Sequence, residues 1–555
     1  MPFQLSPGVA VVEKDFTSIV PAVATSTGGF AGNFQWGPVL DPVTINSENN
    51  LVQRFGKPTD DTATAFFTAA NFLSYTNNLI VIRVDADGLL NATGGAAGLK
   101  IKNTDQYTAS FAGGNSDTYG MFAAKYPGIL GNSITVSMAD SGNFSAWAYK
   151  GLFEAAPATS TYADNAGGAD DEMHMVIIDE LGAWTGQAGT VLERFGFVSK
   201  ASDAKQDDGT NNYYKDVVNS RSKYVWWMDH KSATNWGDAA TAEFDTITGT
   251  LDVTMDHGAN DTSSQGQLQT GWEIFANGEQ YDVRLLPLGA CDTTTATYVI
   301  NNVCETRLDC VAFVSPNDGG DPIIDTGSDA TDAINSYRDA LPSSSYAVMD
   351  SGYKYQYDRY NDKYRWIPLN ADIAGLCART DYQADPWYSP GGLNRGQIKN
   401  VVKLSFNPTK TDRDVLYANG VNPVVTFPGQ GTILFGDKTL LAKPSAFNRI
   451  NVRRLFIVLE KTISTAAKSQ MFEFNDTFTR AQFKNLVEPF LRDVQGRRGI
   501  TDFLVKCDET NNTGEVIDSN EFVADIFVKP SRSINFITLN FVAARSSVAF
   551  SEIGQ

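Results

Sequence analysis

The sequence predicts a mixed α/β (α+β) protein of several domains. Its α/β core is built from both ends of the chain and carries a mostly β inserted domain and extended terminal arms. The chain has 555 residues, more than one hydrophobic core usually holds. Helix-period segments alternate with short apolar runs near both ends, whereas the middle is rich in Gly, Ala, Ser, Thr, Asn and Asp. Hydrophobic residues make up 42% and charged residues 19%, which favours packed cores over disorder.

Residues 1–22 are predicted to form an extended N-terminal arm. Pro7-Gly8 is followed by the β-branched residues Val9, Val11 and Val12, a pattern typical of a strand and unlike a helix. Because the segment lies at a chain end, it can leave its own domain while breaking few contacts.

Residues 23–87 are predicted to form the first part of the core, with two short helices and a strand. The first helix is expected to follow Ser47 and end at Gly56, and the second to be capped within Asp60-Asp61. The apolar run Leu79–Val84 predicts a buried strand. The residues at helical spacing are Leu51, Val52 and Phe55 in the first helix, and Phe66, Ala69, Ala70 and Leu73 in the second.

Residues 88–280 are predicted to form a mostly β, acidic inserted domain. The alternating segments Ile134–Met138 and Met175–Ile178 predict strands. The pair Trp226-Trp227 is interpreted as core packing or as a wedge between domains, and a carbohydrate-binding face is the alternative.

Residues 281–525 are predicted to form the second part of the core. A strand at Tyr281–Leu286, a helix and a strand at Cys310–Val314 follow one another in the order of a βαβ unit. The apolar residues assigned to the helix are Val299, Ile300, Val303 and Leu308.

Further elements follow in the same part of the chain. The stretch Tyr353–Asp358 alternates as an amphipathic strand does, and Ala371–Ala378 has the small residues of a closely packed helix. Asp476 is expected to cap another helix, which Gly496 to Gly499 end before a strand at Phe503–Val505.

Residues 526–555 are predicted to form a C-terminal strand arm, because Ile534–Val542 alternates strongly. A strand at each end of a chain invites pairing with another subunit. The predicted strand-exchange residues are Val9, Val11, Val12, Ile534, Phe536, Thr538 and Asn540.

Charge is unevenly distributed along the chain, whose net charge is −20. Residues 1–350 contain 18 Lys and Arg against 43 Asp and Glu, whereas residues 351–555 contain 26 against 21. The net charge opposes binding to phosphates, so no direct nucleic-acid partner is expected. Two interpretations stay open: an acidic domain beside a near-neutral one, or a last third that faces acidic partners in an assembly.

No pattern of residues points to catalysis, a cofactor or a metal site, so none is expected. The three histidines, His174, His230 and His257, have no ligand partner at helical spacing and no neighbouring nucleophile motif, which favours packing or surface roles. The five cysteines contain no Cys-x-x-Cys pair. Neither a secretory signal nor a run of eighteen apolar residues is present, so no membrane insertion is expected.

Motifs in the two parts of the core and the terminal arms, and one in the insertion, follow one another in a distinctive order. They are Leu5–Val9, Gly32–Pro38, Arg54–Pro58, Asn71–Tyr75, Tyr126–Asn132, Gly352–Asp358, Ala371–Asp381, Asn394–Ile398, Asn448–Phe456 and Arg532–Ala543. In these segments the sequence resembles the tail sheath proteins of contractile-tailed bacteriophages, particularly the T4-like group. The resemblance covers roughly residues 1–90 and 281–545. It departs from the family between Val84 and Tyr126, where an outward-facing domain is expected to be reduced.

The resemblance implies a non-enzymatic virion protein assembled in the host cytoplasm. Its subunits would form stacked hexameric rings around a tail tube, in contact with baseplate and tail terminator proteins. Contraction would drive the tube through the host envelope without a cofactor. The acidic insertion would lie at the outer radius. The predicted contacts with the tube or a neighbouring subunit are Lys484, Arg492, Arg497 and Arg498.

Two other functions remain as alternatives. A sheath of a bacterial contractile injection system would share the same motifs. A glycan-binding or glycan-cleaving tailspike would instead predict regular β repeats and an aromatic, acidic groove, and the sequence has neither.

Overall fold

The computed structural model describes residues 24–114, 116–231, 235–249, 252–535 and 538, and it is a mixed α/β protein as predicted. The predicted strand-exchange residues Val9, Val11, Val12, Phe536 and Asn540 lie outside the described residues. The chain divides into two compact units. One, here the core unit, contains Ala24–Pro386 and Pro390–Arg453. The other, here the C-terminal unit, contains Trp387–Ser389 and the chain from Arg454 onward.

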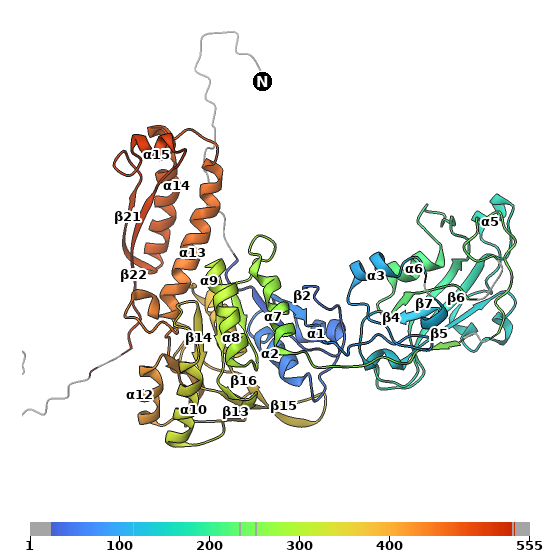
Figure 1. Ribbon diagram of the computed structural model, residues 1–555, viewed down its shortest axis with the longest axis horizontal. Coiled ribbons are helices and arrows are strands. Elements are labelled where there is room, and N and C mark those ends of the chain that lie inside the picture. Colours follow the sequence, from blue (N-terminus) through green and yellow to red (C-terminus); the bar gives the residue numbers. More distant parts are fainter. Residues whose placement is uncertain (1–23, 115, 232–234, 250–251, 536–537, 539–555) are drawn as a thin grey trace, which may run out of the picture. The chain divides into compact units, whose positions relative to one another are not determined.

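A seven-stranded sheet with the order β18-β14-β11-β10-β1-β3-β2 forms the centre of the core unit (Figure 1). Its neighbouring strands are parallel except for β2 and β3. β1 pairs with β3 on one side and with β10 on the other, so segments before and after the insertion share one sheet, as predicted. The strands are β1 Gly28–Gly32, β2 Val43–Ile45, β3 Leu79–Arg83, β10 Leu285–Pro287, β11 Val311–Val314, β14 Ala347–Asp350 and β18 Val421–Asn422.

Helices pack around this sheet, and α2 approaches β1 closely. A Cβ atom on Gly28 would lie 2.5 Å from the Phe72 ring, so glycine is required at that position. The helices are α1 Glu48–Phe55, α2 Ala63–Leu73, α7 Gln265–Glu273, α8 Thr293–Val299, α9 Glu305–Arg307, α10 Gly327–Asp339, α11 Asn370–Gln383 and α12 Lys410–Ala418.

The ends of the first two helices test the predicted caps. Ser47 caps α1 as predicted, since its side chain accepts a hydrogen bond from the Asn50 backbone N–H. The predicted cap of α2 within Asp60-Asp61 is wrong. The Thr62 hydroxyl accepts a hydrogen bond from the Thr59 backbone N–H at 2.9 Å, and the resulting turn delays the helix until Ala63.

Two predictions around β10 need correction. The strand begins at Leu285 rather than Tyr281. Leu308 was assigned to the helix, but it lies just after α9 and is about half exposed. A π-helical turn at Ile300–Cys304 changes the rotation of the side chains, and the chain leaves α9 with Leu308 in the left-handed conformation (φ 62°).

The inserted segment contains a four-stranded antiparallel sheet in the order β7-β6-β5-β9 and a β4–β8 pair, together with several short helices, so it is mixed rather than mostly β. Trp226 and Trp227 are buried, and Trp226 stacks on Tyr107 with ring centroids 4.2 Å apart, which confirms core packing. The elements are α3 Thr104–Ser110, α4 Ser116–Tyr119, β4 Phe122–Ala124, β5 Ile134–Asp140, α5 Thr161–Ala166, β6 Glu172–Asp179, β7 Thr190–Ser199, α6 Tyr214–Arg221, β8 Val225–Trp227 and β9 Asp252–Thr254.

The insertion ends earlier than residue 280, the predicted boundary. Helix α7 packs on β1 and on α8, so it belongs with the central sheet. The physical reason is the apolar side of α7, where Gly271 and Trp272 are buried and Trp272 makes an edge-to-face contact with Phe30 of β1. Apart from the start of the C-terminal arm at residue 526, the other predicted domain boundaries stay predictions.

Smaller sheets complete the core unit. Figure 1 shows β15 and β16 as a hairpin, and β17 pairs with the free side of β15. The strands are β12 Asn317–Asp318, β13 Asp321–Pro322, β15 Tyr353–Asp358, β16 Lys363–Pro368, β17 Lys403–Leu404, β19 Val424–Phe427 and β20 Gly431–Leu434.

The C-terminal unit packs helices against a two-stranded hairpin. Helix α13 (Ile450–Ala467) enters it from the core unit, and α14 (Thr477–Gly496) follows after a loop. β21 (Ile500–Lys506) pairs with β22 (Asp525–Pro530), and α15 (Gly514–Asp518) lies between them in the chain. The core residues include Trp387, Leu455, Leu459, Phe483, Val487, Leu491, Val494, Ile500 and Val505.

Candidate functional site: the C-terminal unit and a buried polar clasp

Helix α14, which carries the predicted contact residues, is fixed at its start and along one face. Asp476 caps it as predicted, because its carboxylate accepts a hydrogen bond from the Thr479 backbone N–H at 2.8 Å. That hydrogen bond lowers the pKa of the Asp476 carboxyl. Phe483, Val487 and Leu491 recur at helical spacing and are buried, so the opposite face is left for other contacts.

The four predicted basic residues do not form one uniform cationic face. Lys484 and Arg492 both lie beside Glu488, with N–O distances of 3.6 and 3.2 Å. Arg497 pairs with Asp493 at 3.5 Å and also lies over the Trp387 ring. Arg498 is exposed at the end of the helix, with φ 67°. The structure therefore brings Lys484 and Arg492 together around one carboxylate, and leaves their role as contacts a prediction.

The hairpin after α14 shows that the predicted C-terminal arm cannot begin at residue 526. Residues from 526 were expected to form an arm, but Asp525–Pro530 pairs with β21 of the same chain. Leu504 and Phe527 lie opposite each other in this pairing, and both are exposed. Ile534 and Thr538 are exposed and lie outside any strand, so their exchange between subunits stays a prediction.

A buried polar cluster, which we call the clasp, joins segments about 300 residues apart. Lys354 Nζ lies 2.9 Å from Asp372 Oδ1, and the Tyr75 hydroxyl donates to the same oxygen at 3.0 Å. Asn71 donates to Gln356 at 2.9 Å. Burial raises the pKa of Asp372 and lowers that of Lys354, while the charge of each partner opposes these shifts. In the sequence these residues lie in separate motifs, and no local pattern connects them.

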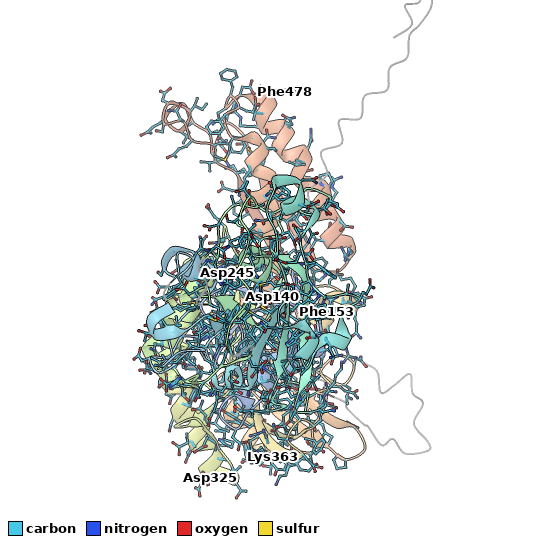
Figure 2. All side chains as sticks on the ribbon, turned by 90° about the vertical axis from the view of Figure 1, so that its right-hand side faces the viewer. Asp140, Phe153, Asp245, Asp325, Lys363 and Phe478 are labelled. Carbon is cyan, nitrogen blue, oxygen red and sulfur yellow. The ribbon has the colours of Figure 1, made fainter. Side chains whose placement is uncertain are left out.

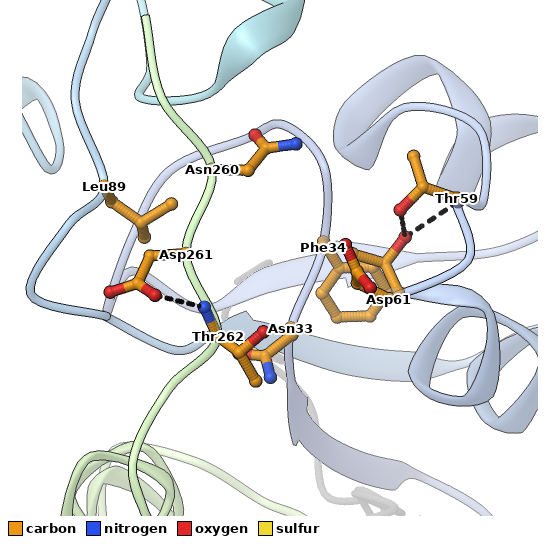
Figure 3. Close-up of a pocket in the computed structure, with 9 residues that line it drawn as sticks. Asn33, Phe34, Thr59, Asp61, Leu89, Asn260, Asp261 and Thr262 are labelled. Carbon is orange, nitrogen blue, oxygen red and sulfur yellow. Dashed lines mark hydrogen bonds between the residues drawn. The ribbon is translucent and has the colours of Figure 1, made fainter.

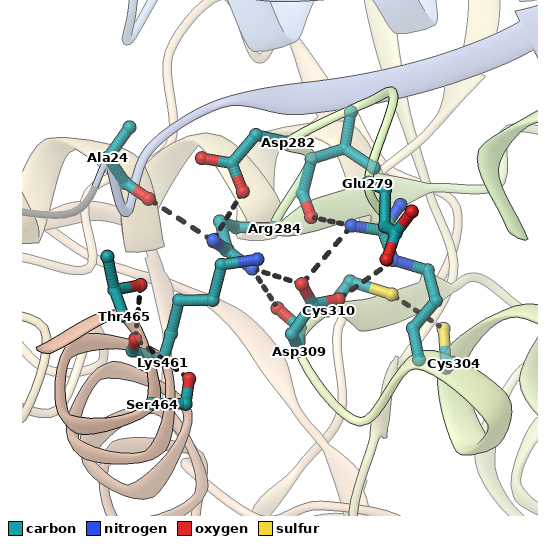
Figure 4. Close-up of polar contacts among 12 residues, drawn as sticks. Ala24, Glu279, Asp282, Arg284, Cys304, Asp309, Cys310, Lys461, Ser464 and Thr465 are labelled. Atoms are coloured by element: carbon teal, nitrogen blue, oxygen red, sulfur yellow. Dashed lines mark hydrogen bonds and ion pairs between the residues drawn. The ribbon is translucent and has the colours of Figure 1, made fainter. Parts of the chain in front are cut away.

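A second polar cluster fixes the start of the described chain beside β10 (Figure 4). Arg284 donates to Asp309 at 2.6 Å and to the backbone oxygen of Ala24 at 3.2 Å. Arg307 donates to Asp309 at 2.8 Å. Burial alone would raise the pKa of Asp309, but the two guanidinium groups lower it. The nearby thiols of Cys304 and Cys310 are buried, with their sulfur atoms 3.7 Å apart.

A small, largely polar pocket is lined by Asn33, Asp61, Leu89, Asn260 and Asp261 among others (Figure 3). Its volume is about 190 Å³, less than the ~300 Å³ at which ligand pockets usually begin. Asp261 is already engaged, since it accepts hydrogen bonds from the backbone N–H groups of Gly88 and Thr262. The pocket therefore resembles a gap between loops more than a substrate site.

The three histidines, for which packing or surface roles were expected, divide between the two: His174 and His230 pack against aromatic rings, and His257 is exposed. His174 is buried and stacks on Phe153 with ring centroids 4.1 Å apart, and His230 stacks on Trp236. Among the residues that the structure describes, no three His, Cys, Asp or Glu side chains converge as metal ligands would. Within the same part of the chain, no helix combines the length and apolarity needed to cross a bilayer.

Comparison with known proteins defines the class. The phage tail sheath protein central domain matches residues 261–440, and the phage tail sheath C-terminal domain matches residues 442–544. The N-terminal region of domain III of the tail sheath protein Gp18 matches residues 25–84. The chain belongs to the phage tail sheath protein family, and these matches leave the inserted segment between them.

Individual relatives match along the whole chain. It is 35% identical to the tail sheath protein of Vibrio phage KVP40 and 32% identical to that of Enterobacteria phage T4, with 99% of each chain covered. The tail sheath protein of Salmonella phage ViI is 32% identical, with 99% of this chain and 98% of the relative covered. The alignments with KVP40 and T4 span 680 and 671 positions against 555 residues here, so these relatives contain segments that this chain lacks.

Solved structures share the fold. The sheath tail protein Lin1278 from Listeria innocua has a TM-score of 0.55 at 12% identity, with 92% of this chain and 96% of that chain covered. The sheath tail protein DSY3957 from Desulfitobacterium hafniense has a TM-score of 0.54 at 13% identity, with 94% and 100% covered. The helical sheath of the anti-feeding prophage in the contracted state has a TM-score of 0.50 at 14% identity, with 98% of this chain and 100% of that chain covered.

Proposed function

We propose that the chain is the structural subunit of a contractile phage tail sheath. The observation that carries this proposal is the 32–35% identity to three phage tail sheath proteins over nearly the whole length of each chain. Subunits polymerise as stacked hexameric rings around a tail tube and contract to drive the tube through the host envelope. The protein acts as a component of the virion, after assembly in the host cytoplasm.

The role is structural and not enzymatic. Contraction needs no cofactor if the energy is stored in the extended lattice, which is then kinetically trapped rather than most stable. The partners are other copies of this chain, the tail tube protein, the baseplate and the tail terminator. A solved relative comes from a contracted helical sheath, which supports self-assembly as the common property of the fold.

A sheath of a bacterial contractile injection system is the second candidate. The fold supports it equally, because the anti-feeding prophage sheath is among the structures with the same fold. Its 14% identity is well below the 35% shared with a phage protein, which favours the phage tail.

Negative-stain microscopy of the purified full chain tests the proposal. Long striated tubes are the expected result, and compact oligomers of fixed size would contradict it. Addition of purified tail tube should then give tubes with a filled centre, whereas a tailspike would show neither form.

A further inference from the structure

The loop between α13 and α14 presents much apolar surface to solvent. The side chains of Phe472, Phe474 and Phe478 are 100%, 84% and 73% exposed, and Met471 beside them is 59% exposed. We call these four residues, of which Phe478 lies in the first turn of α14, the apolar loop. Figure 2 shows Phe478 projecting at the start of α14. Contiguous exposed apolar residues of this kind mark interaction sites more often than solvent-facing loops.

Hydrogen bonds order the backbone between Phe474 and Phe478 in the apolar loop. The Asn475 side chain donates to the backbone oxygen of Glu521 at 2.8 Å and accepts from Arg480 at 2.9 Å. The Asp476 backbone N–H donates to Phe474 at 3.0 Å. Phe472 has φ 72°, in the left-handed region that bulky residues rarely adopt. The rings are exposed to solvent on this turn.

The β15–β16 hairpin in the core unit has a complementary surface. Tyr355 and Tyr357 alternate on one face of β15, opposite Trp366 and Tyr364 of β16. Ring centroids are 4.7 Å apart for Tyr355 and Trp366 and 5.3 Å apart for Tyr357 and Tyr364. We call these four rings the aromatic face.

The two sides of this hairpin differ in what covers them. Lys354, Gln356 and Asp358 point to the other side and are buried. On the aromatic face, Tyr357 and Tyr364 are 47% and 50% exposed. Tyrosine and tryptophan in such rows are the side chains most enriched at the energetic centres of interfaces.

Charge distinguishes the two surfaces. Glu473 is exposed between Phe472 and Phe474 in the apolar loop. Lys403 is exposed at the edge of the aromatic face, with its ammonium 5.0 Å from the Tyr355 ring centroid and 5.3 Å from that of Trp366. The two surfaces therefore carry opposite charges, which favours their association.

We propose that the apolar loop of one copy of this chain docks on the aromatic face of a second copy. The four side chains of the apolar loop expose roughly 500 Å² of accessible surface. That is a large part of the ~800 Å² of surface that each partner buries in a standard interface. Two different surfaces on one chain make a heterologous contact, which generates rings or helices rather than closed dimers. The inference rests on the proposed function and adds the surfaces through which subunits meet.

Photo-crosslinking in polymers of the purified full chain, without tail tube, tests the contact. Benzoylphenylalanine replaces Phe474, and equal parts of isotopically heavy and light protein are mixed before assembly. We expect mixed-isotope adducts to peptides of residues 353–366 or to Lys403, and none in dispersed subunits. The matched control places the same group at Tyr382, which is 94% exposed and lies on α11. It should give no adduct to those peptides.

The outcomes separate the two proposals. Failure of the unmodified chain to form tubes would overturn the proposed function and the docking with it. Tubes in which position 474 crosslinks to other segments, or reacts only when tail tube is added, would overturn the docking alone.

A charge swap tests the same contact without a probe. Glu473→Lys and Lys403→Glu should each raise the concentration needed for tube formation about tenfold, because each places like charges together. The double variant should restore assembly to within about threefold of the unmodified chain. The contact would be overturned if the two increases in the concentration needed for tube formation multiplied in the double variant. It would also be overturned if either single variant assembled normally.

Discussion

Lys354 Nζ lies 2.9 Å from Asp372 Oδ1, and neither side chain is exposed to solvent. The Tyr75 hydroxyl donates to the same carboxylate oxygen, and Lys354 also donates to the backbone oxygen of Lys399 at 2.9 Å. One ion pair thus connects the end of α2 with β15, α11 and the loop before β17. Removing one member leaves the other as a buried charge without compensation.

Lys354→Met should therefore lower the free energy of unfolding by about 3–5 kcal/mol, measured by urea denaturation. The double variant Lys354→Met with Asp372→Asn should recover part of that loss, because no buried charge remains. Lys363→Met is the matched control. It removes a solvent-exposed partner of Asp60 on the neighbouring strand and should have little effect. A loss no greater than that of the control would contradict a stabilising clasp.

Asp350 gives the core unit a dependence on pH. Burial raises the pKa of its carboxyl to about 8, although hydrogen bonds from the Gly352 backbone N–H and the Ser315 hydroxyl oppose the shift. Below about pH 4 the group is protonated in both the folded and the unfolded state. Between about pH 4 and pH 8 the carboxyl ionises only in the unfolded state, and this ionisation stabilises the unfolded state. The free energy of unfolding therefore decreases as the pH rises through this range.

Asp350→Asn removes the ionisation and should remove that loss. The variant should be no less stable than the unmodified chain near pH 8, and its relative stability should increase steadily from pH 4 to pH 8. Thermal unfolding of both proteins across this range measures the difference. A difference that is flat with pH would contradict a raised pKa at Asp350.

Local signals in the sequence predicted several elements correctly, but not those set by packing. Ser47 and Gly56 bound α1, and Asp476 caps α14, because capping depends on residues next to each other. β1 was missed, since its sequence Gly-Gly-Phe-Ala-Gly has low strand propensity. Gly28 is required by the close approach of Phe72 of α2, and Gly29 by that of Leu286 of β10, which no local pattern reveals.

The clasp was equally hidden, because its members lie about 300 residues apart. One signal was available. Lys354, Gln356 and Asp358 share one face of a strand whose other face is aromatic, and charged residues on a covered face need buried partners. Tyr75 and Asp372 could not be identified as those partners until the fold placed α2 and α11 beside the strand.

The basic residues of α14 are predicted to contact an acidic tail tube. Reversal of Lys484, Arg492, Arg497 and Arg498 to Glu should weaken binding of the sheath to the tube at least tenfold, and binding of the unmodified chain should weaken with salt. Co-sedimentation with purified tubes measures both effects.

The matched control changes net charge by the same amount in the insertion, which is predicted to lie at the outer radius. Lys150, Lys205, Arg221 and Lys223 are exposed there, and their reversal to Glu should leave tube binding unchanged. Equal binding by both quadruple variants would refute the placement of α14 against the tube. Glu488 already lies beside Lys484 and Arg492, so Glu488→Gln should strengthen tube binding if the tube is acidic.

The two terminal segments are predicted to link subunits and to be dispensable for folding. In the described part of the C-terminal unit, β21 and β22 pair with each other, and Ile534 beyond them is 82% exposed. An exposed isoleucine outside its own sheet is better covered by another subunit, as strand exchange would do. Each main-chain hydrogen bond of an added strand would contribute about 0.5–1.5 kcal/mol.

Removal of residues 1–20, or separately of residues 532–555, should leave a soluble chain that melts cooperatively but forms no sheath. Microscopy of each truncated protein measures assembly, and calorimetry measures folding. A truncated chain that still forms contractile tubes would show that the missing arm is not a linker. If removal of residues 532–555 instead unfolds the C-terminal unit, that segment completes its own subunit, because folding would then depend on contacts within one chain.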